Sequence, residues 1–309
     1  MGSPMIARLA SLRTHPSVFR HLTGLTAEAF AALAADVVPA VEAAHRTTLD
    51  RPDRQRAIGA GGEFGLSPAD QVLLAVVWLR QYPTQEVLGF LFGVSDSTAL
   101  RAVRRCLPVL ERAGRDTMRM PDPGPGRRKK LPALLADTPG LAVVIDTFEQ
   151  RTQRPKRRQR AYYSGEKKAH TLKSQVGVDE DSGRVVDVSD TVPGPWADIK
   201  LLKKSRLLKR LPEGVGGIGD LAYVGIADLH PAGLGAAPRR KPPGRDRPPA
   251  DRRYNRAFSR RRIVVEHAIG RLRRFRAVAH VNRHRRKGHA ARVRAVAGLV
   301  NRMLPQPTP

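Results

Sequence analysis

Leu141-Ala-Val-Val-Ile-Asp146-Thr-Phe148 is the stretch of sequence that decides the fold. A continuous apolar run that ends in an acid predicts a central, buried strand with a carboxylate at its end. The segment 215–220 repeats the pattern, because it predicts a short strand that ends in Asp220. Two strand ends of this kind can present Asp146 and Asp220 side by side.

The elements around these two segments indicate the fold class. The sequence predicts strands over 173–178 and 184–188, a helix over 197–210, and helices over about 255–277 and 288–303. Strand, strand, strand, helix, strand, helix is the order of an α/β ribonuclease H-like core, a mixed sheet with flanking helices.

An all-α region precedes this core. A helix over 85–92, a turn at Gly93 and a helix over 96–107 predict a helix-turn-helix within 84–107, although a plain helical hairpin would show the same pattern. In the helix-turn-helix interpretation, the second helix presents Arg101, Arg104 and Arg105 to DNA. The expected organisation is a helical domain over 1–120, a Pro- and Gly-rich linker over 121–135 and a catalytic domain over 136–309.

Composition points to a polyanionic partner. The 309 residues carry 56 Lys and Arg against 28 Asp and Glu, a net charge of +28 that favours nucleic acid. With the single cysteine Cys106, a Cys-rich zinc site is excluded. No apolar run is long enough to cross a bilayer and no secretory signal is visible, so we expect a cytoplasmic, nucleoid-associated bacterial protein with no membrane partner.

A third carboxylate stands out in the basic C-terminal part. From residue 239 to residue 294 the sequence has 21 Lys or Arg and three acids, of which Glu266 alone lies within a predicted helix core. Arg262, Glu266, Gly270 and Arg273 share one face of that helix. Taken alone, Glu266 also fits a surface salt bridge with Arg262 or Arg273. Together with Asp146 and Asp220 it fits a site for two Mg²⁺ or Mn²⁺ ions, which prefer carboxylate oxygens and catalyse phosphodiester chemistry.

Three blocks of residues resemble DDE transposases. They are Ile145-Asp146-Thr147, Gly219-Asp220-Leu-Ala-Tyr223 and the segment from Asn255 through Arg262, Glu266 and Arg273 to Phe275. The match is nearest to the insertion-sequence-five group and its Harbinger-like relatives. Lys167-Lys168-Ala-His170-Thr171-Leu-Lys173, Gly194-Pro-Trp-Ala-Asp198 and the helical block 66–110 are similar to that group as well. The resemblance covers about residues 20–303, and its motifs are specific as a set.

The resemblance implies that Asp146, Asp220 and Glu266 are the catalytic, metal-binding triad. It adds Lys168, Lys173, Arg262 and Arg273 as DNA contacts. In the related insertion-sequence-four group a Tyr, Arg, Glu, Lys signature surrounds the Glu; here Ser259 replaces Tyr and Arg273 replaces Lys. Trp196 is expected either to stack on a base or, more in keeping with a Trp in general, to belong to the core.

The function that follows is a transposase that binds terminal inverted repeats as a homodimer, cuts DNA and joins the freed 3′-OH to target DNA. A catalytically inactive regulator derived from a transposase is the first alternative. An RNA-binding or ribosome-associated basic protein is the second.

Overall fold

The computed structural model describes residues 7–50, 65–124 and 131–305. The chain divides into two compact units. The first contains the N-terminal helices up to Asp116, Arg274–Ala279 and residues 294–305. The second contains Thr117–Arg273 and His280–Val293. The sequence placed everything from residue 136 in one catalytic domain, whereas two C-terminal segments cluster with the N-terminal helices.

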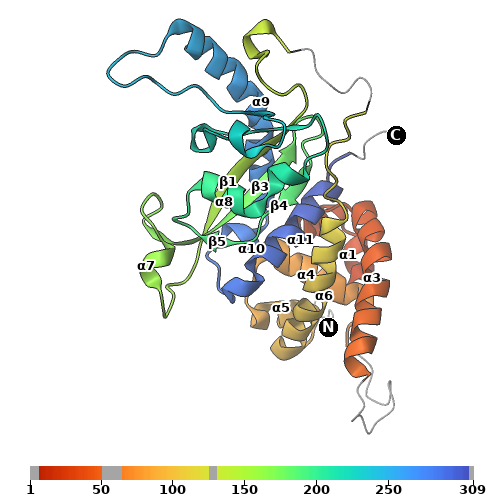
Figure 1. Cartoon of the computed structure of the whole chain (residues 1–309). Helices are drawn as coiled ribbons and strands as arrows, with labels where there is room; N and C mark the ends of the chain where they lie inside the picture. Colours follow the sequence, from red (N-terminus) through yellow and green to blue (C-terminus); the bar gives the residue numbers. More distant parts are fainter. Residues whose placement is uncertain (1–6, 51–64, 125–130, 306–309) are drawn as a thin grey trace. The chain divides into compact units, whose positions relative to one another are not determined.

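The first unit is all helical (Figure 1, red to yellow). Its helices are α1 (Leu9–Arg13), α2 (Pro16–Thr23), α3 (Ala27–Leu49), α4 (Pro68–Gln81), α5 (Gln85–Phe92) and α6 (Asp96–Arg115). Hydroxyl side chains cap four of them by accepting a backbone N–H bond, and these residues are Thr26, Ser67, Thr84 and Ser95. Helix α4 has the most continuous buried run, Gln71 to Leu79, and forms the centre of the unit.

Helices α5 and α6 form the predicted helix-turn-helix. Gly93, at φ 60°, ends α5 in the left-handed conformation that glycine adopts readily. Gly89 makes the tight turn possible, because a Cβ there would lie 2.6 Å from the Val94 carbonyl oxygen. Helix α6 continues past Pro108 to Arg115, eight residues beyond the expected end, because Val109 and Leu110 are buried and hold its second half.

The C-terminal segments of this unit pack at close range. Phe275 is fully buried, and the Arg80 guanidinium lies 5.2 Å from its ring centre. Helix α11 (His289–Arg302) meets α6 where Gly298 faces Gly114: a Cβ on Gly298 would come within 2.2 Å of the Gly114 Cα. Two glycines at one crossing are a tertiary feature that the sequence pattern did not reveal.

The second unit is a mixed sheet with flanking helices (Figure 1, green to blue), which confirms the predicted fold class. Its strands are β1 (Ala142–Arg151), β2 (Tyr163–Ser164), β3 (Ala169–Asp179), β4 (Val185–Val188), β5 (Val192–Pro193), β6 (Gly216–Ile218) and β7 (Gly235–Ala236). The order is β2-β3-β1-β6-β7, and β4 and β5 pair with β3. β3 is antiparallel to β1, whereas β6 and β7 continue the sheet in parallel.

Short helices and turns connect the strands. They are η1 (Ala133–Leu135), α7 (Gln159–Tyr162), α8 (Asp198–Ser205), η2 (Leu207–Arg210), η3 (Leu221–Tyr223) and η4 (Ala227–Leu229). The helix expected over 197–210 is broken into α8 and η2 at Arg206, whose φ is 53°. One core cluster fills the space between the sheet and α8, and it includes Val143, Ile145, Leu202, Leu208 and Tyr223.

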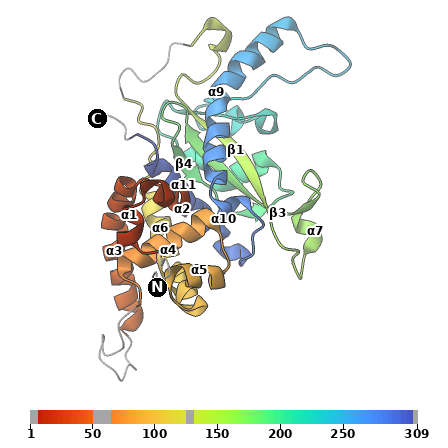
Figure 2. The ribbon, with the colours of Figure 1, turned by 180° about the vertical axis from the view of Figure 1, so that it is seen from behind.

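The remaining elements lie towards the C-terminal end of the chain, and most of them belong to this unit. Helix α9 (Pro249–Arg273) runs beside β1 and β3, as Figure 2 shows. It starts six residues earlier than expected, because Pro248-Pro249 provides a proline at the first helical position. Helix α10 (Arg276–Ala279), which clusters with the first unit, and η5 (Arg286–Gly288) follow. No single helix among the described residues is long and apolar enough to span a bilayer; the bent pair α2 and α3 passes that test jointly, by length and composition alone.

Candidate functional site

Asp146 lies within β1, and Asp220 follows the adjacent parallel strand β6 by two residues. The register pairs Val144 with Ile218, so continuing it by two residues sets Asp146 opposite Asp220. Side chains two residues apart share one face of a strand, and neighbouring strands are about 4.8 Å apart. The two carboxylates therefore sit side by side at the edge where β6 ends.

Backbone contacts hold both carboxylates in place. Asp146 Oδ1 accepts the Thr147 N–H at 2.7 Å, and Asp220 Oδ1 accepts the Ala222 N–H at 2.9 Å. The second contact caps the turn η3, which starts directly after Asp220. One oxygen of each carboxylate is thus held by a hydrogen bond from the backbone directly after it.

The electrostatics at Asp146 favour the neutral acid. Burial raises the pKa of Asp146 to about 6, and the charges of Asp220 and Asp198 act in the same direction. The Thr147 N–H and the Arg262 guanidinium oppose the shift. Such a cluster of carboxylates disfavours full ionisation until a cation compensates the charge.

Helix α9 contributes Arg262 directly to this cluster. Arg262 Nη2 lies 3.8 Å from Asp146 Oδ2, and the arginine side chain is only 13% exposed. The helix is anchored by the apolar stripe predicted from the sequence, since Val265, Ala268 and Leu272 are buried.

Glu266 lies one turn beyond Arg262, about 6 Å along the helix axis, and is exposed. Among the described residues no group of three His, Cys, Asp or Glu side chains is close enough to hold a metal ion. The structure thus brings Asp146 and Asp220 together and leaves Glu266 on the adjoining helix face. Gly270 adds open space on that face, because a Cβ there would meet nothing within 4 Å. Arg273 is exposed at the end of the helix.

Asp198 is a further carboxylate in the same electrostatic neighbourhood. Lys173, on β3, pairs with Asp198 at 2.7 Å and approaches Glu149 at 3.6 Å. Lys173 also donates to the Trp196 carbonyl at 2.7 Å, and Thr171 donates to Glu149 at 2.6 Å. The Lys173 side chain is 11% exposed, so the structure places this expected DNA contact inside a buried ion-pair network.

Tyr223 belongs to the buried core cluster of this unit. It is fully buried, its hydroxyl has no hydrogen-bond partner among the described residues, and its ring lies against Gly219. A Cβ on Gly219 would come within 2.6 Å of that ring, so the glycine is required for the packing. Burial, with the charges of Asp198 and then Asp146, raises the pKa of Tyr223 well above its usual value. The spacing Gly219-Asp220-Leu-Ala-Tyr223 thus places a buried hydroxyl in the core cluster, where the charges of Asp198, Asp146 and Asp220 act on it.

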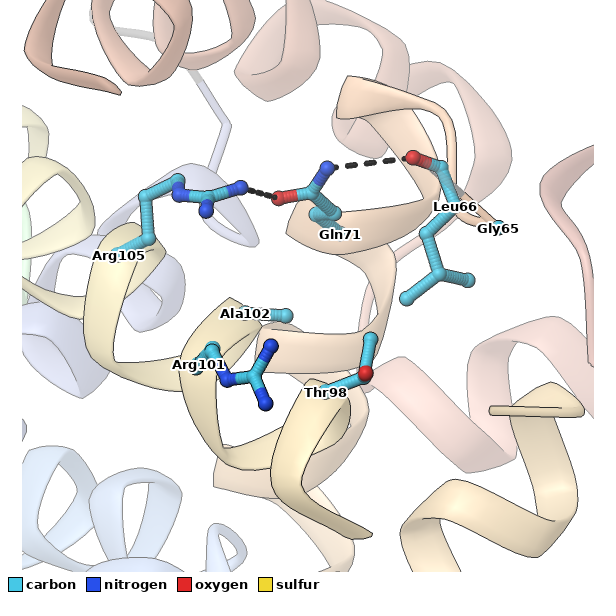
Figure 3. Close-up of a pocket in the computed structure, with 7 residues that line it drawn as sticks. All are labelled: Gly65, Leu66, Gln71, Thr98, Arg101, Ala102 and Arg105. Atoms are coloured by element: carbon cyan, nitrogen blue, oxygen red, sulfur yellow. Dashed lines mark hydrogen bonds between the residues drawn. The ribbon is translucent and has the colours of Figure 1, made fainter. Parts of the chain in front are cut away.

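The remaining basic residues expected to bind DNA differ in environment. Lys168 is exposed and has a φ of 48°. Arg101 and Arg104 are exposed on α6, while Arg105 is half-buried and donates to Gln71 Oε1 at 2.7 Å. Figure 3 shows Arg101 and Arg105 beside a small cavity of about 200 Å³ between α4 and α6.

Two features of the unit were not predicted from the sequence. Arg261 is buried in α9 and makes a paired contact with both carboxylate oxygens of Glu180, at 2.8 and 2.6 Å. Its place on the buried stripe, three residues after Phe258 and four before Val265, is the signal that would have found it. Trp196 is half-buried, with Lys200 and Lys204 4.7 and 5.0 Å from its ring centre.

Comparisons with known proteins identify the family of the chain. Residues 145–301 match the family model of the DDE superfamily endonucleases, and residues 64–116 match the helix-turn-helix of the same superfamily. The chain is 29% identical over 232 residues to a probable transposase for insertion sequence element IS702 from Microchaete diplosiphon. That alignment covers 75% of this chain and 79% of the relative.

No solved structure gives a significant match. The family model covers just over half of the chain, from the strand that carries Asp146 to the end of α11. The chain belongs to the DDE superfamily endonucleases and carries their helix-turn-helix domain, which makes it a transposase-type DNA-binding protein.

Proposed function

We propose that this protein binds the terminal inverted repeats of its own insertion element and cleaves the DNA there with water as the nucleophile. The freed 3′-OH then attacks a phosphate of target DNA, which joins the two strands and releases a 3′-OH of the target. The observation that carries the proposal is the side-by-side placement of Asp146 and Asp220 with Arg262 opposite them. A phosphodiester needs hard cations for its two reacting oxygens and positive charge for its non-bridging oxygens. The two carboxylates would hold the cations, and Arg262 would supply the positive charge.

The residues present fit divalent metal ions. The donor set consists of carboxylate oxygens, which Mg²⁺ and Mn²⁺ prefer. The pKa of Asp146, which burial and the charges of Asp220 and Asp198 raise, marks a site that lacks compensating charge. Asp146 and Asp220 would hold the metal from the sheet, and Glu266 would complete the set from α9. When bound, the ions would activate the attacking oxygen and stabilise the leaving one.

Residues of the chain would bind the DNA and orient the groups of the site. Arg262 would bind a non-bridging phosphate oxygen near Asp146, and Lys173 would hold Asp198 in place through its ion pair. Tyr223 would donate a hydrogen bond from its hydroxyl to a water of the site and so orient it. The α5–α6 helix-turn-helix would bind the repeat, and two such ends imply a homodimer on DNA.

Strand cleavage of the element's own terminal repeat tests this proposal. Wild type would be compared with Asp146→Asn, Asp220→Asn and Glu266→Gln in Mg²⁺ and in Mn²⁺. Glu213→Gln is the matched control, because Glu213 is an exposed acid in the loop before β6. We expect nicking at the repeat boundary, lost in the three site variants and kept in the control. Nicking that survives Asp146→Asn would contradict the proposal.

A catalytically inactive DNA-binding regulator is the second candidate. It is favoured by one observation, the exposed position of Glu266 away from a three-carboxylate group. This candidate predicts tight repeat binding with no cleavage in either metal, and binding that is unchanged in all three site variants.

A further inference from the structure

A groove at the end of β1 lies apart from the carboxylate site. Two chain segments line it, the one that follows β1 and the one that precedes α11, and its volume is about 440 Å³. Its cationic side chains are all exposed: Arg154, Lys156, Arg285, Arg286 and Lys287. None of the ten described residues that line it is acidic. The groove therefore concentrates positive charge from two segments more than 120 residues apart in the chain.

A buried polar network fixes the second segment to the sheet. Asn282 is 1% exposed and pairs with the end of β1: its backbone N–H donates to the Arg151 carbonyl at 2.8 Å. Its side-chain amide donates to the His284 carbonyl at 2.9 Å and to Thr152 Oγ1 at 3.3 Å. Arg292, itself 3% exposed, donates to Asn282 Oδ1 at 2.5 Å.

A second set of buried contacts holds the two ends of the same segment. Gln150 donates to the His280 carbonyl at 2.5 Å, and Gln150 Oε1 lies 2.6 Å from His289 Nε2. Burial lowers the pKa of His289 to about 3, so its ring is neutral at pH 7. Nε2 therefore donates to Gln150, and Nδ1 accepts from Thr191 Oγ1 at 2.7 Å.

The buried contacts of Asn282 and His289 fix the conformation of this segment. Buried polar groups stabilise a fold only when they are satisfied, and a satisfied network specifies one conformation. Here the network holds a segment whose exposed side chains repel one another. One of them is also oriented individually, since the Arg286 guanidinium lies 4.4 Å from the centre of the Tyr162 ring. Because the buried network holds these like charges close together, the groove is suited to a polyanionic partner.

The distance along β1 identifies which part of the partner reaches the groove. Thr152 follows Asp146 by six residues, which is about 20 Å along a strand at about 3.3 Å per residue. Duplex DNA rises about 3.4 Å per base pair, so this distance corresponds to about six base pairs. A duplex with its reacting phosphate at Asp146 can extend far enough to lay its backbone in the groove.

We infer that the groove between residues 152–156 and 282–287 is a second DNA-binding site that holds the phosphate backbone of duplex DNA about six base pairs from the cleaved bond. The inference rests on the proposed function in assigning duplex DNA to the active site. The groove reads no base sequence; it sets the path of the duplex and adds affinity that depends on salt.

A tethered cleavage reagent tests the groove independently of catalysis. Cys106 is the single cysteine of the chain; it is fully buried and burial raises its thiol pKa to about 12. A cysteine introduced by Lys287→Cys can therefore be labelled selectively with an iron chelate that cuts nearby DNA. The experiment uses the full chain with Asp146→Asn and a 40-base-pair duplex. Arg46→Cys, at an exposed arginine of α3, is the control position.

We expect strand cuts from the label at Lys287→Cys and none above background from the label at Arg46→Cys. Equal cutting from both positions, or none from either while the duplex is bound, would overturn the inference. Because the reagent does the cutting, this result stands even if wild type cleaves no DNA, so the two proposals fail separately.

Charge removal gives the second test. The variant Arg285→Gln/Arg286→Gln/Lys287→Gln removes three exposed charges, and Arg13→Gln/Arg20→Gln/Arg46→Gln removes three from exposed positions on the N-terminal helices. For the groove variant we expect the slope of log affinity against log salt to fall by about one for each phosphate that the groove no longer neutralises. Affinity for the 40-base-pair duplex should fall at least about tenfold, with little change for an 8-base-pair duplex.

The control variant should bind both duplexes as wild type does. Equal losses in the two variants would show that the groove contributes only bulk charge, and stronger competition by structured RNA of equal length than by duplex DNA would overturn the assignment to DNA.

Discussion

Asp146 and Asp220 differ from Glu266 in how the fold holds them. The two aspartates are placed by strand register and by backbone N–H contacts. Glu266 is placed only by the turn of a helix that packs on the sheet, and it is exposed. In the proposed site the sheet would supply a fixed pair of ligands, and the helix would supply a third group whose approach depends on what binds between them.

The largest expected effect is the loss of cleavage when one of the two aspartates is replaced. Asp146→Asn should reduce cleavage of the terminal repeat by at least about 10³-fold, because it removes a ligand that nothing nearby replaces. Repeat binding should stay within about twofold of wild type. The check is single-turnover cleavage beside a binding titration; a cleavage loss below tenfold would remove Asp146 from the site.

Lys173 comes next, because it pairs with the buried carboxylates of Asp198 and Glu149. Lys173→Met would leave Asp198 and Glu149 buried without their cation, so we expect a loss of about 3–5 kcal/mol in the free energy of unfolding. Lys168→Met, at an exposed lysine on the adjacent turn, should change it by less than about 0.5 kcal/mol. Denaturant unfolding measures both. A stable Lys173→Met protein with a weaker salt dependence of DNA binding would return Lys173 to the role of a DNA contact.

The ionisation of Asp146 also changes the free energy of unfolding, by less than Lys173→Met does. Its pKa is raised from 3.8 to about 6, so the folded chain binds this proton more tightly than the unfolded chain does. The resulting stabilisation is present below pH 4 and is lost as the pH rises through 6, which amounts to about 3 kcal/mol at most.

The comparison with Asp146→Asn isolates that contribution. The variant should become more stable relative to wild type between pH 4 and pH 7, and Mn²⁺ at pH 7 should stabilise wild type alone. Unfolding curves at several pH values measure the difference, and a stability difference that stays constant with pH would contradict the raised pKa.

Tyr223 gives the smallest effect on stability. Tyr223→Phe removes a buried hydroxyl that has no partner among the described residues, so the free energy of unfolding should stay within about 1 kcal/mol or rise. If the hydroxyl positions a carboxylate or water, the rate of cleavage should fall about tenfold with unchanged DNA affinity. Rapid-quench kinetics distinguish the two quantities, and an unchanged rate would leave Tyr223 with a packing role only.

The sequence predicted those features that depend on local pattern. The buried strand around Asp146, the second strand before Asp220 and the capped helices around Gly93 were all found, with α5 at its observed bounds. The predicted strand ends were wrong, because β1 continues to Arg151 and β6 ends at Ile218. The fold class followed from the order of these elements.

Features that depend on tertiary packing were missed. Lys173 has the appearance of a DNA-binding lysine in the sequence, and only the pairing of β3 with β1 and the approach of α8 enclose it. Arg261 is one of three consecutive arginines, of which it alone is buried. The clustering of the last helix with the N-terminal unit required the close approach of Gly114 and Gly298, which no local pattern signals.

Calorimetric titration of Mn²⁺ into the protein tests the central claim most directly, that Asp146 and Asp220 together create the metal site. The account predicts Mn²⁺ binding to wild type without DNA, its loss in Asp146→Asn and Asp220→Asn, and its retention in Glu266→Gln until DNA is added. Mn²⁺ binding that survives both aspartate variants, or that is lost without DNA in Glu266→Gln alone, would contradict it.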